Sequence, residues 1–429
     1  MRILYTECSP NFGGKELRIL EEMEWFQRRG HDVRLAAANG SAIQAAAAER
    51  GLKVVPVKFR GSFNPSVIPR LLAACWNHGT QLIVTHDSRD TTNAWPSAKI
   101  LGLPLIRYQM ICKPLKGGFV HKMVWRHTAD DIVAVSESIR RRLINHRLAA
   151  HDDVRVVGEY VDTEIFHPQV PPGDVRARYG IPEDGKLIVH IGMIRPDKGQ
   201  HLLVSAADKI LETHPDCWFM FVGGPIRTQF LDDLEKCIHD IRRPERIIVA
   251  GFQKEVAPYI AAGNIVCLTS LLEAQSKVIP QAFAMRKLVV APDTGGIPEL
   301  IQHRRNGLLY AGGDPEALVA AVNEALADKS EILAARGYEL AQAMDINRIM
   351  TQTEKLYETW IYDTALDSRG DVSPRQPPRR RFHHRKRGKI SAANGMAAAR
   401  KLPDARRGNI FARLARRISS AAALLRHHV

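Results

Sequence analysis

Two cations lie close together in a segment that could hold a negatively charged ligand. Arg195 and Lys198 follow an apolar run, beside Gly192 and just before a predicted helix start. Two cations at a glycine turn and a helix N-terminus can clamp a diphosphate. A diphosphate gains negative charge as it leaves a reacting carbon, so these cations would also lower the barrier. An isolated pair with this spacing, however, would more often be two exposed loop charges.

A carboxylate and an amide follow further along the chain. Glu273 is expected to close a strand, and Gln281 falls one turn inside the helix that follows a loop of small residues. A carboxylate there can accept hydrogen bonds from sugar hydroxyls, and an amide can reach the hydroxyls of a ribose. Gly295 and Gly296 make a further glycine turn after the next strand, and we expect it to face the same cleft.

Near the amino terminus, another pair of glycines opens a helix. Gly13 and Gly14 would let the backbone approach a ligand closely, and the helix N-terminus would offer free N–H groups to an anion. A tight turn between strand and helix, with no ligand, is about as frequent an explanation for this pair alone.

The elements that must position these residues alternate along the chain. Short apolar runs predict strands, and residues recurring at helical spacing separate them. Such alternation predicts parallel sheets with helices on both faces, which is a Rossmann-like α/β fold. The predicted strands are residues 2–6, 33–37, 54–57, 82–85, 105–108, 132–135 and 154–157 in the first half, then 187–191, 218–222, 247–250, 265–268, 288–291 and 308–310.

The pattern divides the chain into two domains and a tail. Residues 1–161 form a first Rossmann-like domain, and a polar, proline-bearing linker covers residues 162–186. Residues 187–345 form a second such domain, and an amphipathic helix at residues 346–367 should cross back to the first. Parallel α/β domains bind ligands beyond the carboxyl ends of their strands, so we expect a cleft between the two domains.

The charge of +15 belongs to the tail. Residues 368–429 contain 17 Lys/Arg and two acids, so the rest of the chain is electrically balanced. Most of this tail is predicted to be disordered, with a basic amphipathic helix near its end. One interpretation is a solvated extension, and another is a segment that docks on anionic lipid, at about 1 kcal/mol per basic residue. Nucleic-acid binding is disfavoured because the tail has few aromatics and the body has no basic excess.

Cysteines and apolar runs indicate where the protein works. The six cysteines are scattered with no CxxC pair, which predicts reduced, mostly buried thiols and argues against structural zinc. No apolar run has the length of a membrane span, and the first residues do not resemble a signal peptide. We therefore expect a cytoplasmic protein, with peripheral association to the inner face of the membrane if the tail binds lipid.

Together these segments resemble the retaining GT-B glycosyltransferases of the group 1 or family 4 type. The resemblance covers roughly residues 1–362 and is most specific at residues 273–309, which match the family's E-x7-E helix, GGIPE turn and NGLL strand. Residues 161–168 (VDTEIFHP) resemble the family's linker, and residues 131–138 resemble its last N-terminal strand.

The resemblance implies roles for individual residues. Gly13 and Gly14 would contact the donor phosphate and sugar, and His86 would lie near the anomeric carbon, although a lone histidine at a strand end is more often structural. The backbone of Ser276, Lys277 and Val278 would face the phosphates. The remaining roles would fall to residues already described: Gly192, Arg195 and Lys198 at the diphosphate in place of a metal, Glu273 at the sugar, Gln281 at the ribose, and Gly295 and Gly296 at the same cleft.

The family likeness also implies a reaction. It would be transfer of a sugar, as in hexosyltransferases, from a nucleotide sugar to a glycan or lipid-linked acceptor with retention of configuration, and without metal or other cofactor. Similar patterns occur in lipopolysaccharide and cell-surface glycan transferases. Three departures from the family pattern are Met193 for an arginine, Gln281 for a glutamate and Arg286 for a glycine. A catalytically silent scaffold and a nucleotide-sugar epimerase therefore stay open as alternatives.

Overall fold

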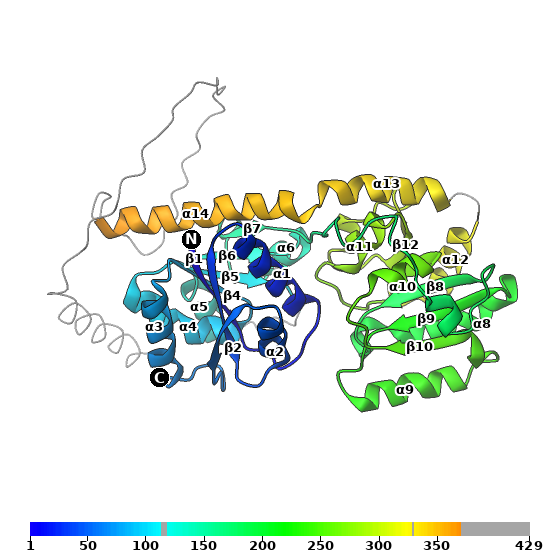
Figure 1. Cartoon of the computed structure of the whole chain (residues 1–429), viewed down its shortest axis with the longest axis horizontal. Helices are drawn as coiled ribbons and strands as arrows, with labels where there is room; N and C mark the ends of the chain where they lie inside the picture. The colour runs from blue at the N-terminus through cyan, green and yellow to red at the C-terminus, as the bar shows by residue number, and fades with distance from the viewer. Residues whose placement is uncertain (113–117, 328–329, 370–429) are drawn as a thin grey trace, which may run out of the picture.

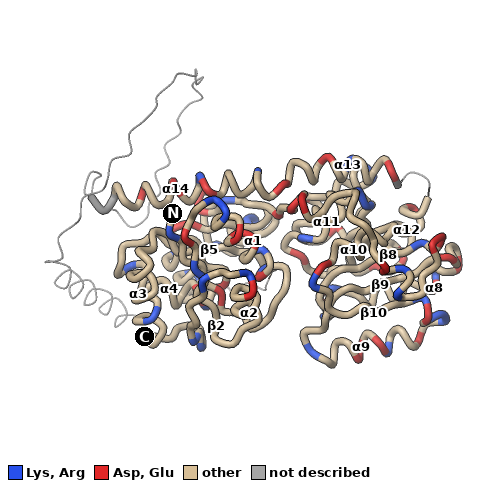
Figure 2. Tube along the Cα trace, in the orientation of Figure 1, with Lys and Arg blue, Asp and Glu red and all other residues tan. Residues whose placement is uncertain are grey.

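The computed structural model describes residues 1–112, 118–327 and 330–369. Two α/β domains stand side by side, and helices α13 (Ser330–Ala343) and α14 (Ile346–Arg369) run along the same side of both, as Figure 1 shows. Residues 370–429, which include nearly all of the basic tail and its predicted terminal helix, lie outside the described residues. So do Lys113 and Lys116, whose place in the sequence would allow contact with an anionic acceptor. Acidic and basic residues are interspersed over both domains (Figure 2).

The first domain contains a parallel sheet of seven strands in the order β3-β2-β1-β4-β5-β6-β7. Its strands are mostly apolar because helices cover both faces of the sheet. The strands are β1 (Arg2–Glu7), β2 (Asp32–Ala38), β3 (Lys53–Val57), β4 (Leu82–Thr85), β5 (Leu105–Gln109), β6 (Asp131–Ala134) and β7 (Val154–Val156). The helices are α1 (Gly14–Arg28), α2 (Ala42–Glu49), α3 (Val67–His78), α4 (Ser88–Leu101), α5 (Phe119–His127) and α6 (Glu137–Asn145).

The second domain repeats this plan with six parallel strands in the order β10-β9-β8-β11-β12-β13. The strands are β8 (Lys186–Ile191), β9 (Cys217–Val222), β10 (Ile247–Gly251), β11 (Ile265–Cys267), β12 (Leu288–Pro292) and β13 (Leu308–Tyr310). The helices are α8 (Gln200–Thr213), α9 (Thr228–His239), α10 (Ala257–Ala262), α11 (Val278–Ala284) and α12 (Pro315–Ala325), followed by α13. Every predicted strand is present, and each end lies within one residue of its predicted position.

Residues 162–186 differ from our expectation of a polar linker. Phe166, Val175 and Ile181 are buried in the same apolar cluster as Leu187 and Val189 of β8. Short helix α7 (Val175–Arg178) lies within this segment. The segment is therefore part of the packing of the second domain.

Helix α14 returns to the first domain, as its amphipathic pattern predicted. The hydroxyl of Tyr357 donates to that of Tyr108 on β5 at 2.9 Å, and the indole N–H of Trp360 donates to Asp131 on β6 at 2.9 Å. Where the chain crosses between domains, the N–H of Val161 donates to the carbonyl of Met344 at 3.0 Å. The N–H of Ile346 donates back to Val161 at 2.9 Å, so the two crossing segments lie side by side.

Two further expectations concern thiols and membrane spans. All six cysteines are free and five of them are buried, as expected. Among the described helices, none combines the length and the apolar character that a bilayer-spanning segment requires.

Candidate functional site

Most of the predicted site residues lie where the strand order reverses in each sheet, whereas Gly295 and Gly296 follow the next strand, β12. In the first domain the reversal is between β1 and β4, and the loops after these strands carry Gly13 and His86. In the second domain it is between β8 and β11, whose following loops carry Lys198 and Glu273. Such switch points are where open α/β sheets bind ligands, because neighbouring loops there turn to opposite faces.

Lys198 and Glu273 form the central ion pair of the second domain. The Lys198 ammonium lies 2.5 Å from Oε2 of Glu273, and the Ser270 hydroxyl donates to the same oxygen at 3.1 Å. The hydroxyl of Thr269 donates to the Lys198 carbonyl at 2.9 Å, which fixes the lysine backbone against the end of β11. Oε1 of Glu273 has no partner among the residues that the structure describes, so it can accept a further hydrogen bond.

Glu273 does not close a strand, contrary to our expectation. Strand β11 ends at Cys267, and Glu273 lies within the ten-residue loop that leads to α11. Gly295 holds this loop in place from the neighbouring turn, with φ of +58°. A Cβ at Gly295 would lie 1.7 Å from the Glu273 carbonyl oxygen, so only glycine permits this packing.

Arg195 lies near Lys198 but has a different partner. Its guanidinium is 2.7 Å from the carboxylate of Asp197. Residues Pro196–Lys198 form a single 3₁₀ turn, and α8 begins two residues later at Gln200. The predicted cation pair is thus on one loop at a helix start, but each cation has its own carboxylate.

Gly13 and Gly14 begin helix α1 and face the second domain. A Cβ at Gly13 would lie 2.6 Å from the Met193 methyl carbon, so the loops after β1 and β8 touch. A Cβ at Gly14 would meet nothing within 4 Å, which leaves room for a ligand there. The N–H of Gly13 donates to Glu16 at 2.9 Å. Met193, which replaces the arginine of the family pattern, therefore occupies the domain junction.

A buried network lies beneath this loop. The Lys15 ammonium is 2.6 Å from Glu7 and 3.2 Å from Glu16, and the Lys15 side chain is 5% exposed. Burial raises the pKa of Glu7, while the neighbouring Lys15 lowers it in part. Burial likewise raises the pKa of Asp90, whose carboxylate accepts from Thr6 and from the backbone N–H of His86.

His86 follows β4, as predicted, and is 3% exposed. Nδ1 lies 2.9 Å from the carbonyl oxygen of Thr6, so it carries the proton and donates, and Nε2 has no hydrogen-bond partner among the described residues. The ring stacks on Tyr5 at 5.8 Å between centroids. Burial lowers the pKa of His86 to about 3, against a small rise from its bond to Thr6. The imidazole is therefore neutral.

The start of α11 connects the two domains. Lys277 forms an ion pair with Glu21 of α1, and its ammonium lies 4.5 Å from the centre of the Tyr160 ring. Val278 is the first residue of the helix, Ser276 is buried before it, and the Gln281 side chain is buried inside it at 4% exposure. The lysine side chain is thus engaged with the first domain.

Two further contacts between domains were not predicted. The Glu299 carboxylate accepts from the backbone N–H of Glu137 at 2.8 Å and of Ser138 at 2.6 Å, so it caps helix α6 of the other domain. Gln275 accepts from the N–H of Glu159 at 2.6 Å. Both residues stand inside the recognised motifs, but no local pattern reveals a partner more than a hundred residues away.

Gly296 allows the same approach. A Cβ there would lie 2.1 Å from the Ala274 carbonyl oxygen and 2.9 Å from the Ser136 side chain of the first domain. The second glycine of the turn therefore lets the two domains come together. Gly192 also lies in a close backbone contact, because a Cβ on Gly223 would be 2.1 Å from its carbonyl oxygen.

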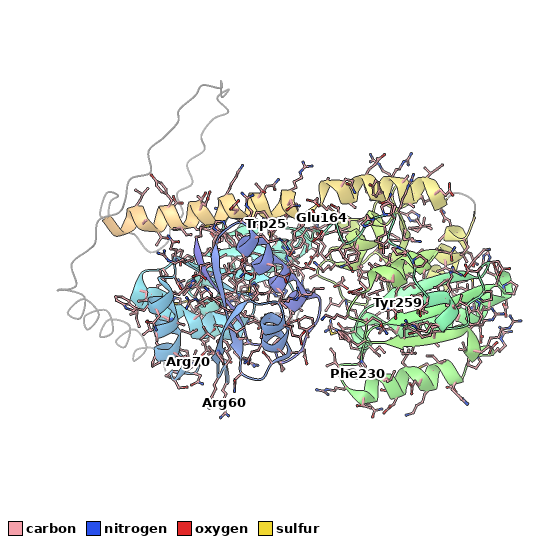
Figure 3. All side chains as sticks on the ribbon, in the orientation of Figure 1. Trp25, Arg60, Arg70, Glu164, Phe230 and Tyr259 are labelled. Atoms are coloured by element: carbon pink, nitrogen blue, oxygen red, sulfur yellow. The ribbon has the colours of Figure 1, made fainter. Side chains whose placement is uncertain are left out.

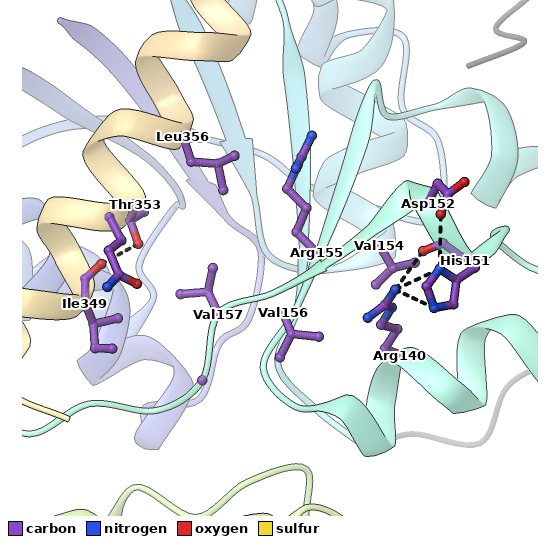
Figure 4. Close-up of a pocket in the computed structure, with 12 residues that line it drawn as sticks. Arg140, His151, Asp152, Val154, Arg155, Val156, Val157, Ile349, Thr353 and Leu356 are labelled. Atoms are coloured by element: carbon purple, nitrogen blue, oxygen red, sulfur yellow. Dashed lines mark hydrogen bonds and ion pairs between the residues drawn. The ribbon is translucent and has the colours of Figure 1, made fainter. Parts of the chain in front are cut away.

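A cavity of about 750 Å³ lies apart from these residues, at the hinge side of the first domain. Edge strand β7, α6 and the first turns of α14 surround it, as Figure 4 shows. Arg140 and Arg155 contribute charge, and Ile349 and Leu356 contribute apolar surface. None of the predicted site residues lines this cavity.

Comparisons with known proteins agree with this geometry. A model of the group 1 glycosyl transferases matches residues 185–328, and a model of glycosyltransferase family 4 matches residues 12–165. The D-inositol 3-phosphate glycosyltransferase of Acidothermus cellulolyticus is 30% identical over 209 residues, 46% of this chain and 46% of that protein. The chain thus covers about half the length of this curated relative.

Solved structures share the fold. A glycosyltransferase from Rickettsia africae superposes with a TM-score of 0.75 at 17% identity, over 84% of this chain and 98% of that one. Anabaena HepE, in complex with UDP and glucose, superposes with a TM-score of 0.74 at 20% identity, over 84% of this chain and all of that one. The family 4 match covers strands β2 to β7 of the first sheet and the group 1 match covers all six strands of the second. The chain belongs to the GT-B glycosyltransferases of the group 1 and family 4 type.

Proposed function

We propose that this protein transfers a sugar from a nucleoside diphosphate sugar to a glycan or lipid-linked acceptor, with retention of configuration and without a metal. The observation that carries the proposal is the meeting of both switch-point loops at one junction. Gly13 touches Met193, and Lys198, which pairs with Glu273, lies near Gly192, since a Cβ on Gly192 would be 4.0 Å from the Lys198 Cδ.

Lys198 would stabilise the leaving diphosphate. Its ammonium already lies at the switch point, where it pairs with Glu273. A diphosphate would bind this ammonium either together with the Glu273 carboxylate or in its place. Cations held in place before the reaction stabilise developing charge without reorganising, and one such group contributes roughly 3–4 kcal/mol to the barrier. Glu273 would then accept hydrogen bonds from the sugar hydroxyls through Oε1.

The first domain would provide the acceptor side of the reaction. Gly14 leaves space for the donor, and the neutral His86 follows the neighbouring strand β4 and stacks on Tyr5. Because the His86 imidazole is neutral, it adds no positive charge next to an oxocarbenium-like transition state. The leaving phosphate itself would take the proton of the attacking hydroxyl, so no covalent intermediate is needed.

The names of related proteins support a nucleotide-sugar donor. The HepE structure is in complex with UDP and glucose, and the Acidothermus relative is named a D-inositol 3-phosphate glycosyltransferase. By analogy we propose a UDP or other nucleoside diphosphate sugar as donor, and a role in lipopolysaccharide or other cell-surface glycan synthesis. Attachment to the inner face of the membrane through the basic tail is part of the same proposal.

The first experiment is a thermal-shift series with UDP, GDP, ADP, CDP and their sugars, with EDTA or Mg²⁺ present. Binding to the native state alone stabilises it by about 2.7 kcal/mol when the ligand is at a hundred times its Kd. We expect one nucleotide to stabilise the wild type in EDTA and Lys198→Ala to lose that shift. Lys209→Ala is the matched control, because Lys209 pairs with Glu316 on the surface of the same domain.

The outcomes separate the alternatives. No stabilisation by any nucleotide would contradict the proposal and favour a silent scaffold. Stabilisation followed by conversion of the donor sugar without any acceptor would favour an epimerase. A shift that needs Mg²⁺ would contradict metal independence.

A further inference from the structure

One stretch of the first domain contains basic residues but no acidic residue. Between Glu49 and Asp87 the sequence contains five Lys/Arg and no Asp or Glu. Arg50 pairs with Glu24, and Lys53 pairs with Asp32. Lys58 and Arg60, in contrast, are exposed and have no ion-pair partner within the described part of the chain.

These two unpaired cations line a cavity of about 530 Å³. Its other lining residues are Gly61, Phe63, Asn64 and Ser66, so it combines cations, an aromatic ring and polar groups. The Phe63 side chain is 38% exposed, so its ring is available to a ligand.

Hydrogen bonds fix the loop that forms this cavity. The side-chain amide of Asn64 donates to the Lys58 carbonyl at 3.1 Å, and its oxygen accepts from the Ser66 N–H at 3.1 Å and hydroxyl at 2.8 Å. The backbone N–H of Asn64 donates to buried Asn93 of α4 at 2.7 Å. The cavity is therefore preformed, which lowers the entropy lost when a ligand binds.

The cavity lies at the same edge of the sheet as the proposed reaction site. It follows β3, and the loops after parallel strands share one edge. Strand β3 is two strands from β1, so the two strands are about 10 Å apart along the sheet. Ser66 also precedes α3, a helix of 12 residues whose N-terminal dipole adds positive potential. Figure 3 shows Arg60 and Arg70 at the end of this domain away from α14.

We propose that this cavity binds an anionic sugar, carrying a carboxylate or a phosphate, in the acceptor. Lys58 and Arg60 contact the anionic group, because they are the unpaired cations of the lining. The exposed ring of Phe63 packs against the apolar face of the sugar ring, and Asn64 and Ser66 offer polar groups to its hydroxyls. This inference rests on the proposed function and specifies the acceptor class for it.

The test measures binding of four soluble probes to the full chain by ligand-observed NMR. Tri-galacturonic acid is compared with neutral maltotriose, and glucose 6-phosphate with neutral glucose. We expect the wild type to bind at least one anionic sugar ten-fold or more tightly than its neutral counterpart. The double variant Lys58→Ala/Arg60→Ala should lose that preference. Phe63→Ala should weaken binding of the anionic sugar at least three-fold. Arg28→Ala/Arg141→Ala is the control, because it removes two exposed charges elsewhere in the same domain.

Two results would overturn the inference. These are equal binding of charged and neutral sugars by the wild type, and an equal loss of the preference in the control variant. Stabilisation by the donor nucleotide is measured on the same samples. If the donor binds and no anionic sugar does, only this inference fails; if no donor binds to the wild type, the proposed function itself fails.

Discussion

At the scale of single residues, His86 illustrates what position in a chain can and cannot reveal. Its place after β4 was evident from the sequence, because an apolar run ends there. Its burial, its stack on Tyr5 and its bond to the Thr6 carbonyl depend on β1, 80 residues earlier. These contacts decide its charge, and no pattern local to His86 contains them.

The depressed pKa of His86 predicts a pH-dependent stability. An unfolded histidine binds a proton below about pH 6.5, whereas native His86 stays neutral down to about 3, so acid favours the unfolded chain. In His86→Asn the amide can still donate to Thr6. We expect the free energy of unfolding of this variant, relative to that of the wild type, to rise by about 1.4 kcal/mol for each pH unit below about 6. Urea unfolding at pH 6.5, 5.5 and 4.5 measures this gain. If the difference in free energy of unfolding between the two proteins is the same at all three pH values, His86 is protonated in the native state.

At the scale of elements, the end of α11 explains one departure from the family pattern. Arg286 replaces a glycine and adopts φ of +57°, because the helix ends there with the Lys287 N–H bonded to the Ala282 carbonyl at 2.9 Å. This left-handed conformation costs a residue with a Cβ roughly 1–2 kcal/mol, and glycine loses about 0.5–1 kcal/mol more than alanine through chain entropy.

Arg286→Gly is therefore expected to stabilise the protein by about 0.5–1 kcal/mol. Arg286→Ala is the control, because it removes the charge but keeps the Cβ, and its stability should stay near that of the wild type. Scanning calorimetry of the three proteins compares their unfolding temperatures. If Arg286→Ala raises the unfolding temperature as much as Arg286→Gly does, the stabilisation comes from removing the charge of the exposed arginine and not from relief of its backbone conformation.

Helix α6 depends on a residue of the other domain. The Glu299 carboxylate accepts hydrogen bonds from two backbone N–H groups at the start of α6. The hydroxyl of Ser136 accepts a third, from the N–H of Ile139 at 3.2 Å. Loss of a cap costs about 1 kcal/mol. We expect Glu299→Ala to lower the free energy of unfolding by about this much, and Glu299→Gln to lower it less. Hydrogen exchange of the Glu137 and Ser138 amides should become faster in Glu299→Ala. Unchanged exchange at these two amides would mean that the contact contributes nothing.

The elements themselves were largely predictable, and the reason is physical. Parallel strands covered by helices on both faces must be apolar throughout, so all strands stood out as short apolar runs. The loops were less predictable. Glu273 was placed at a strand end although β11 stops at Cys267, because Leu268, Leu271 and Leu272 prolong the apolar run in the sequence. The apolar anchors Phe166, Val175 and Ile181 were likewise hidden among the prolines of the linker.

At the scale of the whole molecule, the two domains meet through polar contacts. Gln275, Lys277 and Glu299 of the second domain each bind the first, and the two crossing segments pair at Val161 and Met344. Interfaces of this kind between domains of one chain usually permit relative motion. Closure of the domains around a donor would exclude water, which otherwise hydrolyses it.

The Lys277–Glu21 pair should control that closure. The Lys277 side chain is only 10% exposed in the described arrangement, so removing the charge of its partner would leave a buried cation without an anion. Separation of the domains would return the Lys277 ammonium to water. We therefore expect Glu21→Gln to increase the radius of gyration measured by small-angle X-ray scattering.

Two further variants make this prediction specific. Glu24→Gln is the matched control, because Glu24 lies on the same helix and pairs with Arg50 inside the first domain, so the radius should not change. Lys277→Met in the Glu21→Gln background removes the unpaired cation and should restore the compact form. If Glu21→Gln and the wild type scatter alike at low and high salt, the remaining contacts of Gln275 and Glu299 suffice, and the ion pair does not set the arrangement of the domains.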